Sequence, residues 1–264
     1  MIALKIQNLS KRYQLGVVTA QTISMDINRW WSKIRGKVDP ASEVTSENIL
    51  MRENSSKYVW ALNDINFEVN QGERIGIIGK NGSGKSTLLK IISRITSPTK
   101  GLIKINGTVG SLLEVGTGFD GELTGLENIY LYGSILGMTT NVINNNLEKI
   151  IKFSGIESYI NTPLKRYSSG MRIRLGFAVT SFLDADILIL DEVFAVGDQK
   201  FQEEAMNKIK ELATEQNRTI LFVSHNLETI KKNTNRCIIL DNGSLLDHGN
   251  TADMINKYLK HINE

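Results

Sequence analysis

One stretch decides the fold of this chain: Gly79-Lys80-Asn81-Gly82-Ser83-Gly84-Lys85-Ser86-Thr87. A short apolar run, Ile75 to Ile78, precedes it, and apolar residues at the spacing of one helix face follow it, beginning at Leu88. A strand, a glycine-rich loop and a helix in this order form a phosphate cradle, because glycine lets backbone N–H groups converge on one anion and the helix N-terminus adds positive potential. The pattern GxxxxGK[ST] in this setting predicts nucleotide binding.

The same stretch assigns roles to its polar residues. Lys85 is expected to reach the β- and γ-phosphates of a nucleoside triphosphate, and the Ser86 hydroxyl to ligate Mg²⁺. The other residues of the loop are candidate nucleotide contacts: Gly79, Lys80, Asn81, Gly82, Ser83, Gly84 and Thr87.

The composition is ordinary for a soluble globular protein. At 264 residues the chain has the length of one domain or, at most, two small ones, and its hydrophobic content of 41% suffices for a full core. The net charge of +3 comes without the long block of like charge that marks a nucleic-acid arm, and it argues neither for nor against an anionic surface nearby. The single cysteine, Cys237, lies in an apolar run, which predicts a buried strand residue and fits a reducing compartment.

Membrane and export signals are absent from the sequence pattern. The first residues contain no extended apolar region of the secretory type. The longest uninterrupted apolar run, Tyr58 to Leu62, is far shorter than the roughly 20 residues that span a bilayer. We therefore expect that the chain does not cross a membrane by itself.

The N-terminal part predicts two strands separated by a long insert. Alternating residues mark strands at Leu4 to Leu9 and at Ile65 to Val69, and the insert covers residues 14–57. Within it Ile27, Trp30, Trp31 and Ile34 have the spacing of one helix face, with basic residues around them. Two interpretations stay open: this helix contacts a membrane surface or membrane subunit, or it packs on its own domain.

The rest of the chain alternates strands and helices. This order predicts a mainly parallel sheet with helices on both faces. The expected strands are Leu102 to Gly107, Gly110 to Val115, Ile187 to Leu190, Thr219 to Val223 and Arg236 to Leu240. The expected helices are Gly125 to Leu136, Asn141 to Ser154 and Ile156 to Ile160, which form a helical insert, and then Phe201 to Thr214 and Leu227 to Lys232.

Two acids follow the apolar strand that ends at Leu190. A buried strand would carry Asp191 to the end of the sheet, where it can hold Mg²⁺ through water, and would place Glu192 beside the γ-phosphate. A carboxylate there can orient the attacking water or accept its proton. The alternative is a buried strand with two solvated acids at its end.

Two further segments suit an anion. One of them begins a helical run with Ser168, Ser169 and Gly170, and a helix N-terminus with serines and a glycine can bind an anion. One domain does not need a second anion site around one triphosphate. The simplest solution is therefore a dimer in which each segment covers the partner's nucleotide. The alternative is a serine-capped helix start. His225 follows the strand Thr219 to Ser224 and can contact the γ-phosphate; its alternative is a solvated loop histidine.

Together these motifs resemble the nucleotide-binding subunit of ATP-binding cassette (ABC) transporters. The signature motif of that family, LSGGQ, corresponds here to Tyr167-Ser168-Ser169-Gly170-Met171, in which Ser169 replaces a glycine and Met171 a glutamine. Ala195-Val196-Gly197-Asp198 resembles the loop that touches the partner subunit, and His225 the switch histidine.

The resemblance also implies an adenine-stacking aromatic and a further metal ligand. Tyr13 matches the aromatic, although the insert separates it from the phosphate loop. Tyr58 or Trp60 could replace it, and the other alternative is that Tyr13 is a strand-end tyrosine with no ligand. Where the family usually has a glutamine that contacts metal or water, this chain has Glu114, whose carboxylate can ligate Mg²⁺.

Glu114, the insert after Tyr13 and the entry Trp60-Ala61-Leu62 resemble the subgroup that exports lipid-linked polysaccharides such as O-antigen and teichoic acid. The implied fold is α/β: a P-loop NTPase (RecA-like) core with a mainly parallel sheet, N-terminal antiparallel strands and an inserted helical subdomain. The expected organisation is a single domain over residues 1–264, with the insert at 14–57, the helical subdomain at 115–167 and a C-terminal extension at 242–264 that is too short for a glycan-binding domain.

The implied function is ATP hydrolysis with Mg²⁺ at the cytoplasmic face of the membrane. The implied partners are a second copy of the chain, arranged head to tail, and a separate multi-spanning permease, with no nucleic acid. Two rivals stay open: an ABC importer subunit for a small solute, and a soluble ABC protein outside transport.

Overall fold

The computed structural model describes residues 1–14, 58–111, 116–190, 199–215, 217–224 and 226–263. The amphipathic helix expected around Trp30 and Trp31 lies outside these residues. Among the helices that the structure describes, none combines the length and the apolar character that crossing a bilayer requires.

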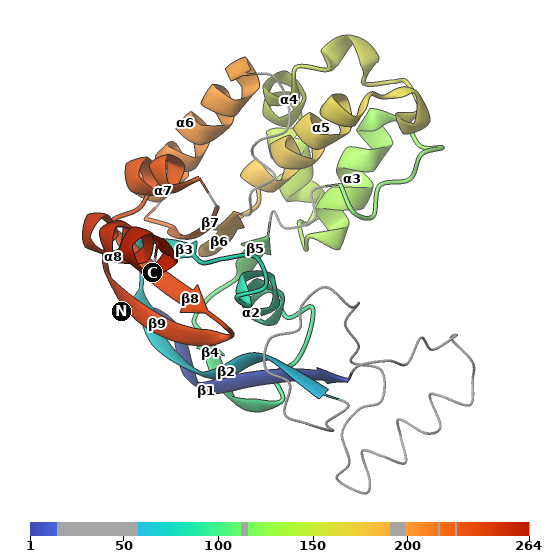
Figure 1. The fold of residues 1–264 in the computed structure, drawn as a ribbon. Coiled ribbons are helices and arrows are strands. Elements are labelled where there is room, and N and C mark those ends of the chain that lie inside the picture. Colours follow the sequence, from blue (N-terminus) through green and yellow to red (C-terminus); the bar gives the residue numbers. More distant parts are fainter. Residues whose placement is uncertain (15–57, 112–115, 191–198, 216, 225, 264) are drawn as a thin grey trace, which may run out of the picture.

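Two β-sheets form the frame of the molecule (Figure 1). The smaller is antiparallel with the order β2-β1-β4, and the larger has the order β5-β6-β7-β3-β8-β9, in which β9 pairs antiparallel with β8 and the other neighbours are parallel. The strands are β1 (Ile2–Gln14), β2 (Tyr58–Asn70), β3 (Arg74–Ile78), β4 (Lys100–Ile105), β5 (Val109–Ser111), β6 (Ile187–Leu190), β7 (Thr219–Val223), β8 (Arg236–Asp241) and β9 (Ser244–Asn250). The predicted α/β class, with a mainly parallel sheet and antiparallel N-terminal strands, is confirmed.

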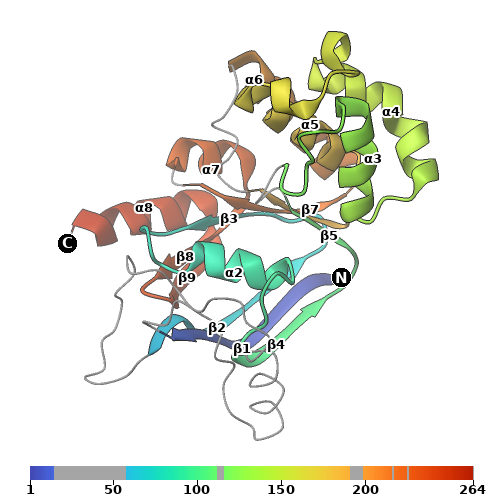
Figure 2. The same cartoon turned by 90° about the vertical axis from the view of Figure 1, so that its right-hand side faces the viewer.

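Helix α2 (Lys85–Ile92) lies between the two sheets (Figure 2). Its apolar residues are buried in one core with side chains of the antiparallel sheet and of the inner strands of the larger sheet: Leu88, Leu89, Ile91 and Ile92. A helix buried on two sides cannot shift without opening the core. The loop that precedes α2 is therefore held in a fixed place.

The opposite face of the larger sheet is covered by α6 (Gln199–Glu215), α7 (Leu227–Asn233) and α8 (Thr251–Asn263), which share a second core cluster with it. The sequence patterns do not predict α8 or β9. Residues 242–264, expected as an extension, contribute an edge strand to the sheet and a helix whose Met254 and Ile255 are buried.

The helical part consists of α3 (Gly125–Ile135), α4 (Thr140–Ser154) and α5 (Ser169–Ser181), which share a third core cluster. Two short 3-10 turns, Glu157–Tyr159 and Leu164–Arg166, connect α4 to α5, so the helix expected from Ile156 to Ile160 is a single turn. The bounds of α3 and α4 agree with the prediction because both begin at threonine caps, Thr124 and Thr139. Because α5 packs with α3 and α4, the helical unit reaches past residue 167.

Cys237 is expected to be inert toward thiol reagents while the protein is folded. Its side chain is fully buried in β8, and burial raises the pKa of the thiol to about 12. Because the thiolate is the reactive form, and because the raised pKa keeps the thiol protonated at pH 8, native labelling by a disulfide reagent should be about a thousandfold slower than that of an exposed cysteine. The control is the urea-unfolded chain, which should label completely; fast labelling of the native protein would contradict the buried placement.

Candidate nucleotide-binding site

The predicted loop lies at one edge of the larger sheet, where several parallel strands end together. Phe222 of β7 pairs with Gly76 of β3 on one side and with Leu190 of β6 on the other. The carboxyl ends of β3, β7 and β6 therefore lie within two residues of one another on the same side of the sheet. In open parallel sheets this edge is where ligands bind.

Glycines in the loop stand where a side chain would collide with the fold. A Cβ on Gly79 would lie 2.3 Å from the carbonyl oxygen of Leu240. Gly84, which caps α2, has a φ of 101°, and its Cβ would lie 2.6 Å from the carbonyl oxygen of Ala61. The loop thus runs against β8 and β2, and its shape depends on both glycines.

The polar groups of the loop suit a phosphate. Lys85 Nζ donates hydrogen bonds to the carbonyl oxygens of Gly79 at 2.7 Å and Lys80 at 2.9 Å, so the ammonium lies across the loop. The buried Ser83 hydroxyl has no hydrogen-bond partner in the part of the chain that the structure describes. Ser86 is exposed on the first turn of α2. A cation, an unpaired hydroxyl and a helix N-terminus in one place fit a polyphosphate.

Tyr13 is the aromatic candidate that contacts the helix of the loop. Its phenol makes a side-chain hydrogen bond with Thr87 in the first turn of α2. Burial raises the pKa of the Tyr13 phenol above its ordinary value, and this hydrogen bond acts in the opposite direction. The ring is therefore neutral at physiological pH.

Tyr58 and Trp60 lie on the other face of the antiparallel sheet. Tyr13 pairs with Val59, whereas Arg12 pairs with Trp60, and successive side chains of a strand point to opposite faces. The Arg12 guanidinium lies 4.7 Å from the ring centroid of Tyr58 and 5.7 Å from that of Trp60. These contacts place both rings with Arg12 and away from Thr87.

The segment Ser168-Ser169-Gly170 opens α5 as a capped helix start. The Ser168 hydroxyl accepts a hydrogen bond from the Met171 N–H at 3.2 Å, and both serines are exposed. A Cβ on Gly170 would meet only the Ser168 hydroxyl, at 3.9 Å. Among the described residues, no neighbour therefore requires glycine at that position.

The helix α5 and the loop helix α2 lie on opposite sides of the larger sheet (Figure 2). The structure does not bring Ser168, Ser169 and Gly170 together with the loop of the same chain. A dimer accounts for such a separation if each segment meets the partner's loop.

The remaining predicted site residues lie outside the described residues: Glu114, Asp191, Glu192, Ala195, Val196, Gly197, Asp198 and His225. The described strands that lead to the acids and to the histidine are β6 and β7. Within the described residues there is also no group of three or more His, Cys, Asp or Glu side chains that could hold a metal. The metal ligands expected at Asp191 and Glu114 stay predictions.

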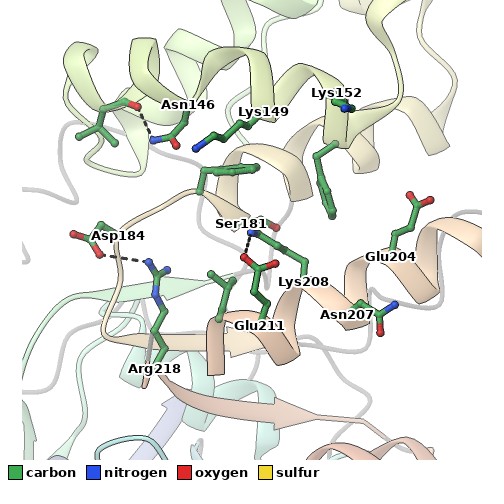
Figure 3. A pocket seen from close by; sticks show the side chains of 14 residues that line it. Asn146, Lys149, Lys152, Ser181, Asp184, Glu204, Asn207, Lys208, Glu211 and Arg218 are labelled. Carbon is green, nitrogen blue, oxygen red and sulfur yellow. Dashed lines mark hydrogen bonds and ion pairs between the residues drawn. The ribbon is translucent and has the colours of Figure 1, made fainter. Parts of the chain in front are cut away.

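A wide hollow of about 1090 Å³ lies elsewhere, between α4, the end of α5, and α6 (Figure 3). Two ion pairs occupy its wall, Lys208 with Glu211 at 2.6 Å and Arg218 with Asp184 at 3.4 Å. No predicted nucleotide contact lines it. The hollow is therefore not the nucleotide site.

The sequence matches the family model described as ABC transporter over residues 62–195. The chain belongs to the ABC transporter family. The matched range begins in β2 and includes the loop, the helical part of this ABC cassette and β6.

Curated relatives of this cassette carry export names. "Teichoic acids export ATP-binding protein TagH" of Bacillus anthracis is 40% identical over 80% of this chain and 38% of that protein. The protein of the same name from Listeria innocua is 44% identical over 75% of this chain and 59% of that protein. "O-antigen export system ATP-binding protein RfbB" of Klebsiella pneumoniae is 43% identical over 76% of this chain and 81% of that protein. The cassette thus spans about two fifths to three fifths of the two teichoic acid relatives.

Solved structures share the cassette fold. The dimeric post-hydrolysis state of the ATP-binding cassette MJ0796, bound to ADP and Pi, aligns with a TM-score of 0.69 over 94% of this chain and 98% of that chain, at 21% identity. A structure of an ATP-binding subunit of an ABC transporter aligns with a TM-score of 0.71 over 97% of this chain and 93% of that chain, also at 21% identity. The predicted P-loop NTPase fold is confirmed.

Sequence reasoning missed Lys11, which lies beneath Tyr13. Its ammonium is 4.9 Å from the centroid of the Tyr13 ring, on the side of the sheet that faces the core. Its position two residues before Tyr13 could have indicated the contact, because residues i and i+2 of a strand share one face.

Proposed function

We propose that this chain is the ATP-hydrolysing subunit of a transporter that exports a lipid-linked polysaccharide across the cytoplasmic membrane. The observation that carries the proposal is the set of relatives at about two fifths identity whose names state teichoic acid or O-antigen export. The glycine-rich loop supports the ATP-binding part, because its cation, helix N-terminus and unpaired buried hydroxyl fit a triphosphate.

In this proposal the described residues bind and orient the nucleotide. Lys85 and the loop N–H groups hold the phosphates, and Tyr13 stacks on adenine, because it shares the side of β1 that contacts Thr87. Ser86 fits Mg²⁺ through its exposed hydroxyl, with Asp191 and Glu114 as the other proposed ligands. Bound Mg²⁺ neutralises charge on the β- and γ-phosphate oxygens.

The chemical step belongs to residues that follow β6 and β7. Glu192 orients the attacking water and accepts its proton, and His225 contacts the γ-phosphate. Catalysis is then mainly positioning and charge stabilisation, as is usual for phosphoryl transfer. The site is completed in trans by Ser168, Ser169 and Gly170 of a second copy.

Coupling to transport follows from closure of this dimer on ATP and its opening after hydrolysis. We propose that the movement reaches a separate membrane subunit through the helical part and the surface near Glu114, at the cytoplasmic face of the membrane. The helical part has its own core, which suits movement as a unit relative to the sheet.

The test is to delete the gene and to measure the glycan on the cell surface. We expect the surface polysaccharide to be lost while its lipid-linked form accumulates inside. Complementation with the wild-type chain should restore export, and Lys85→Ala, the matched control, should not. Intact surface glycan together with loss of uptake of a small solute would support the importer rival; intact glycan and intact uptake would support a role outside transport.

A further inference from the structure

Lys11 is a buried lysine in the strand that carries Tyr13. Its exposed fraction is 6%. Nζ donates hydrogen bonds to the Thr96 hydroxyl at 2.9 Å and to the Ser97 carbonyl oxygen at 2.8 Å. Burying an ammonium is costly unless it is well compensated, so the position calls for a role that an apolar residue could not fill.

The ammonium of Lys11 also lies against the face of the Tyr13 ring. The distance from Nζ to the ring centroid is 4.9 Å, within the range of a cation–π interaction. The hydroxyl end of the same ring is tied to Thr87. Tyr13 is thus held at two points, by the strand residue Lys11 and by the first turn of the phosphate-loop helix.

We propose that Lys11 is a positioning residue for adenine, acting through the ring of Tyr13. This inference rests on the proposed function, because it takes Tyr13 as the surface on which adenine stacks. A cation on one face draws π density toward itself, so the opposite face becomes less negative and stacks better on an electron-rich purine. A ring that is already fixed also loses less conformational freedom when the nucleotide binds.

Lys11 links this ring to the chain segment that leaves α2. Thr96 and Ser97 follow the end of that helix, whereas Thr87 lies in its first turn. The ring is therefore aligned with the helix that presents the phosphate loop. A purely structural Lys11, which only joined β1 to Thr96 and Ser97, would affect stability without any preference for the base.

The experiment compares MgATP with magnesium tripolyphosphate, which has the phosphates but no base, by titration calorimetry on the whole chain. Lys11→Met should weaken MgATP binding by about five- to tenfold and change tripolyphosphate binding less than about twofold. Lys11→Arg keeps a cation that can lie over a ring, so it should restore most of the MgATP affinity. Lys5→Met, on the same strand and paired with half-buried Glu68, is the matched control and should change neither.

A double-mutant cycle with Tyr13→Leu tests whether Lys11 acts through the ring. Once Tyr13 is replaced, Lys11→Met should cause no further loss of MgATP affinity. If Lys11→Met does not fold, Lys11→Gln carries the same test, because it keeps a donor for Thr96 and Ser97 and removes the charge.

Three results would contradict the proposed role of Lys11. Equal weakening of ATP and tripolyphosphate, unchanged MgATP affinity, or an undiminished effect of Lys11→Met beside Tyr13→Leu would overturn the role of Lys11. Failure of the nucleotide-binding part of the proposed function would look different, since the wild-type chain would then bind neither MgATP nor tripolyphosphate. Failure of the export part would appear only in the gene-deletion test.

Discussion

Replacing Glu192 by glutamine is expected to leave MgATP binding intact and to slow hydrolysis by about two orders of magnitude or more. Phe222 pairs with both Gly76 and Leu190, so β6 ends within two residues of the end of β3, the strand that enters the phosphate loop. Strand β6 therefore ends at the edge of the sheet where the loop lies. Glutamine keeps the size of Glu192 and one acceptor oxygen but cannot accept the proton of the attacking water.

The same variant should accumulate a closed dimer in the presence of MgATP. If hydrolysis reopens the dimer, a variant that binds ATP without cleaving it keeps the dimer closed. The closed dimer should then be detected by size-exclusion chromatography with light scattering. Glu68→Gln replaces a half-buried acid on the antiparallel sheet and is the control; it should hydrolyse ATP normally and remain monomeric after turnover. Near-normal turnover by Glu192→Gln would refute Glu192 as the catalytic carboxylate.

Replacing Gly170 by alanine is expected to reduce ATPase activity by about tenfold to a hundredfold without loss of stability. Among the described residues an added methyl group would meet only the Ser168 hydroxyl, at 3.9 Å. Alanine also favours a helix by up to about 1 kcal/mol over glycine. The melting temperature should therefore stay the same or rise. Activity should fall because the methyl group would occupy the space in which the partner's nucleotide approaches the backbone.

Two other glycines make this prediction specific. Gly121→Ala adds a methyl group at 3.7 Å from the nearest atom and should leave both stability and activity unchanged. Gly79→Ala should damage both, since its Cβ would lie 2.3 Å from the Leu240 carbonyl oxygen. If Gly170→Ala retained full activity at every protein concentration, a close approach in trans at this segment would be ruled out.

Local patterns accounted for most of the elements of the fold. The helices α3 and α4 begin where threonine caps precede them, and the strands β6 and β7 coincide with apolar runs that a parallel sheet buries on both faces. The C-terminal strand β9 was not predicted because most of its residues are polar and none is fully buried, and because its pairing with β8 is a tertiary contact. Helix α8 was not predicted either, because its burial depends on the sheet against which it packs.

For the candidate site, the sequence by itself determined the phosphate loop, because glycine spacing, a lysine and a following helix are local properties that need no distant partner. The sequence did not decide which of three aromatic residues stacks on adenine, because a single chain segment does not reveal which face of a strand meets the core. Only the tertiary structure, through the pairing of β1 with β2 and the packing of α2 between the sheets, placed Tyr13 with Thr87 and Lys11, and Tyr58 and Trp60 with Arg12 on the opposite face. The choice rests on the register of two strands separated by residues 15–57, and such a register is decided by burial across the whole sheet.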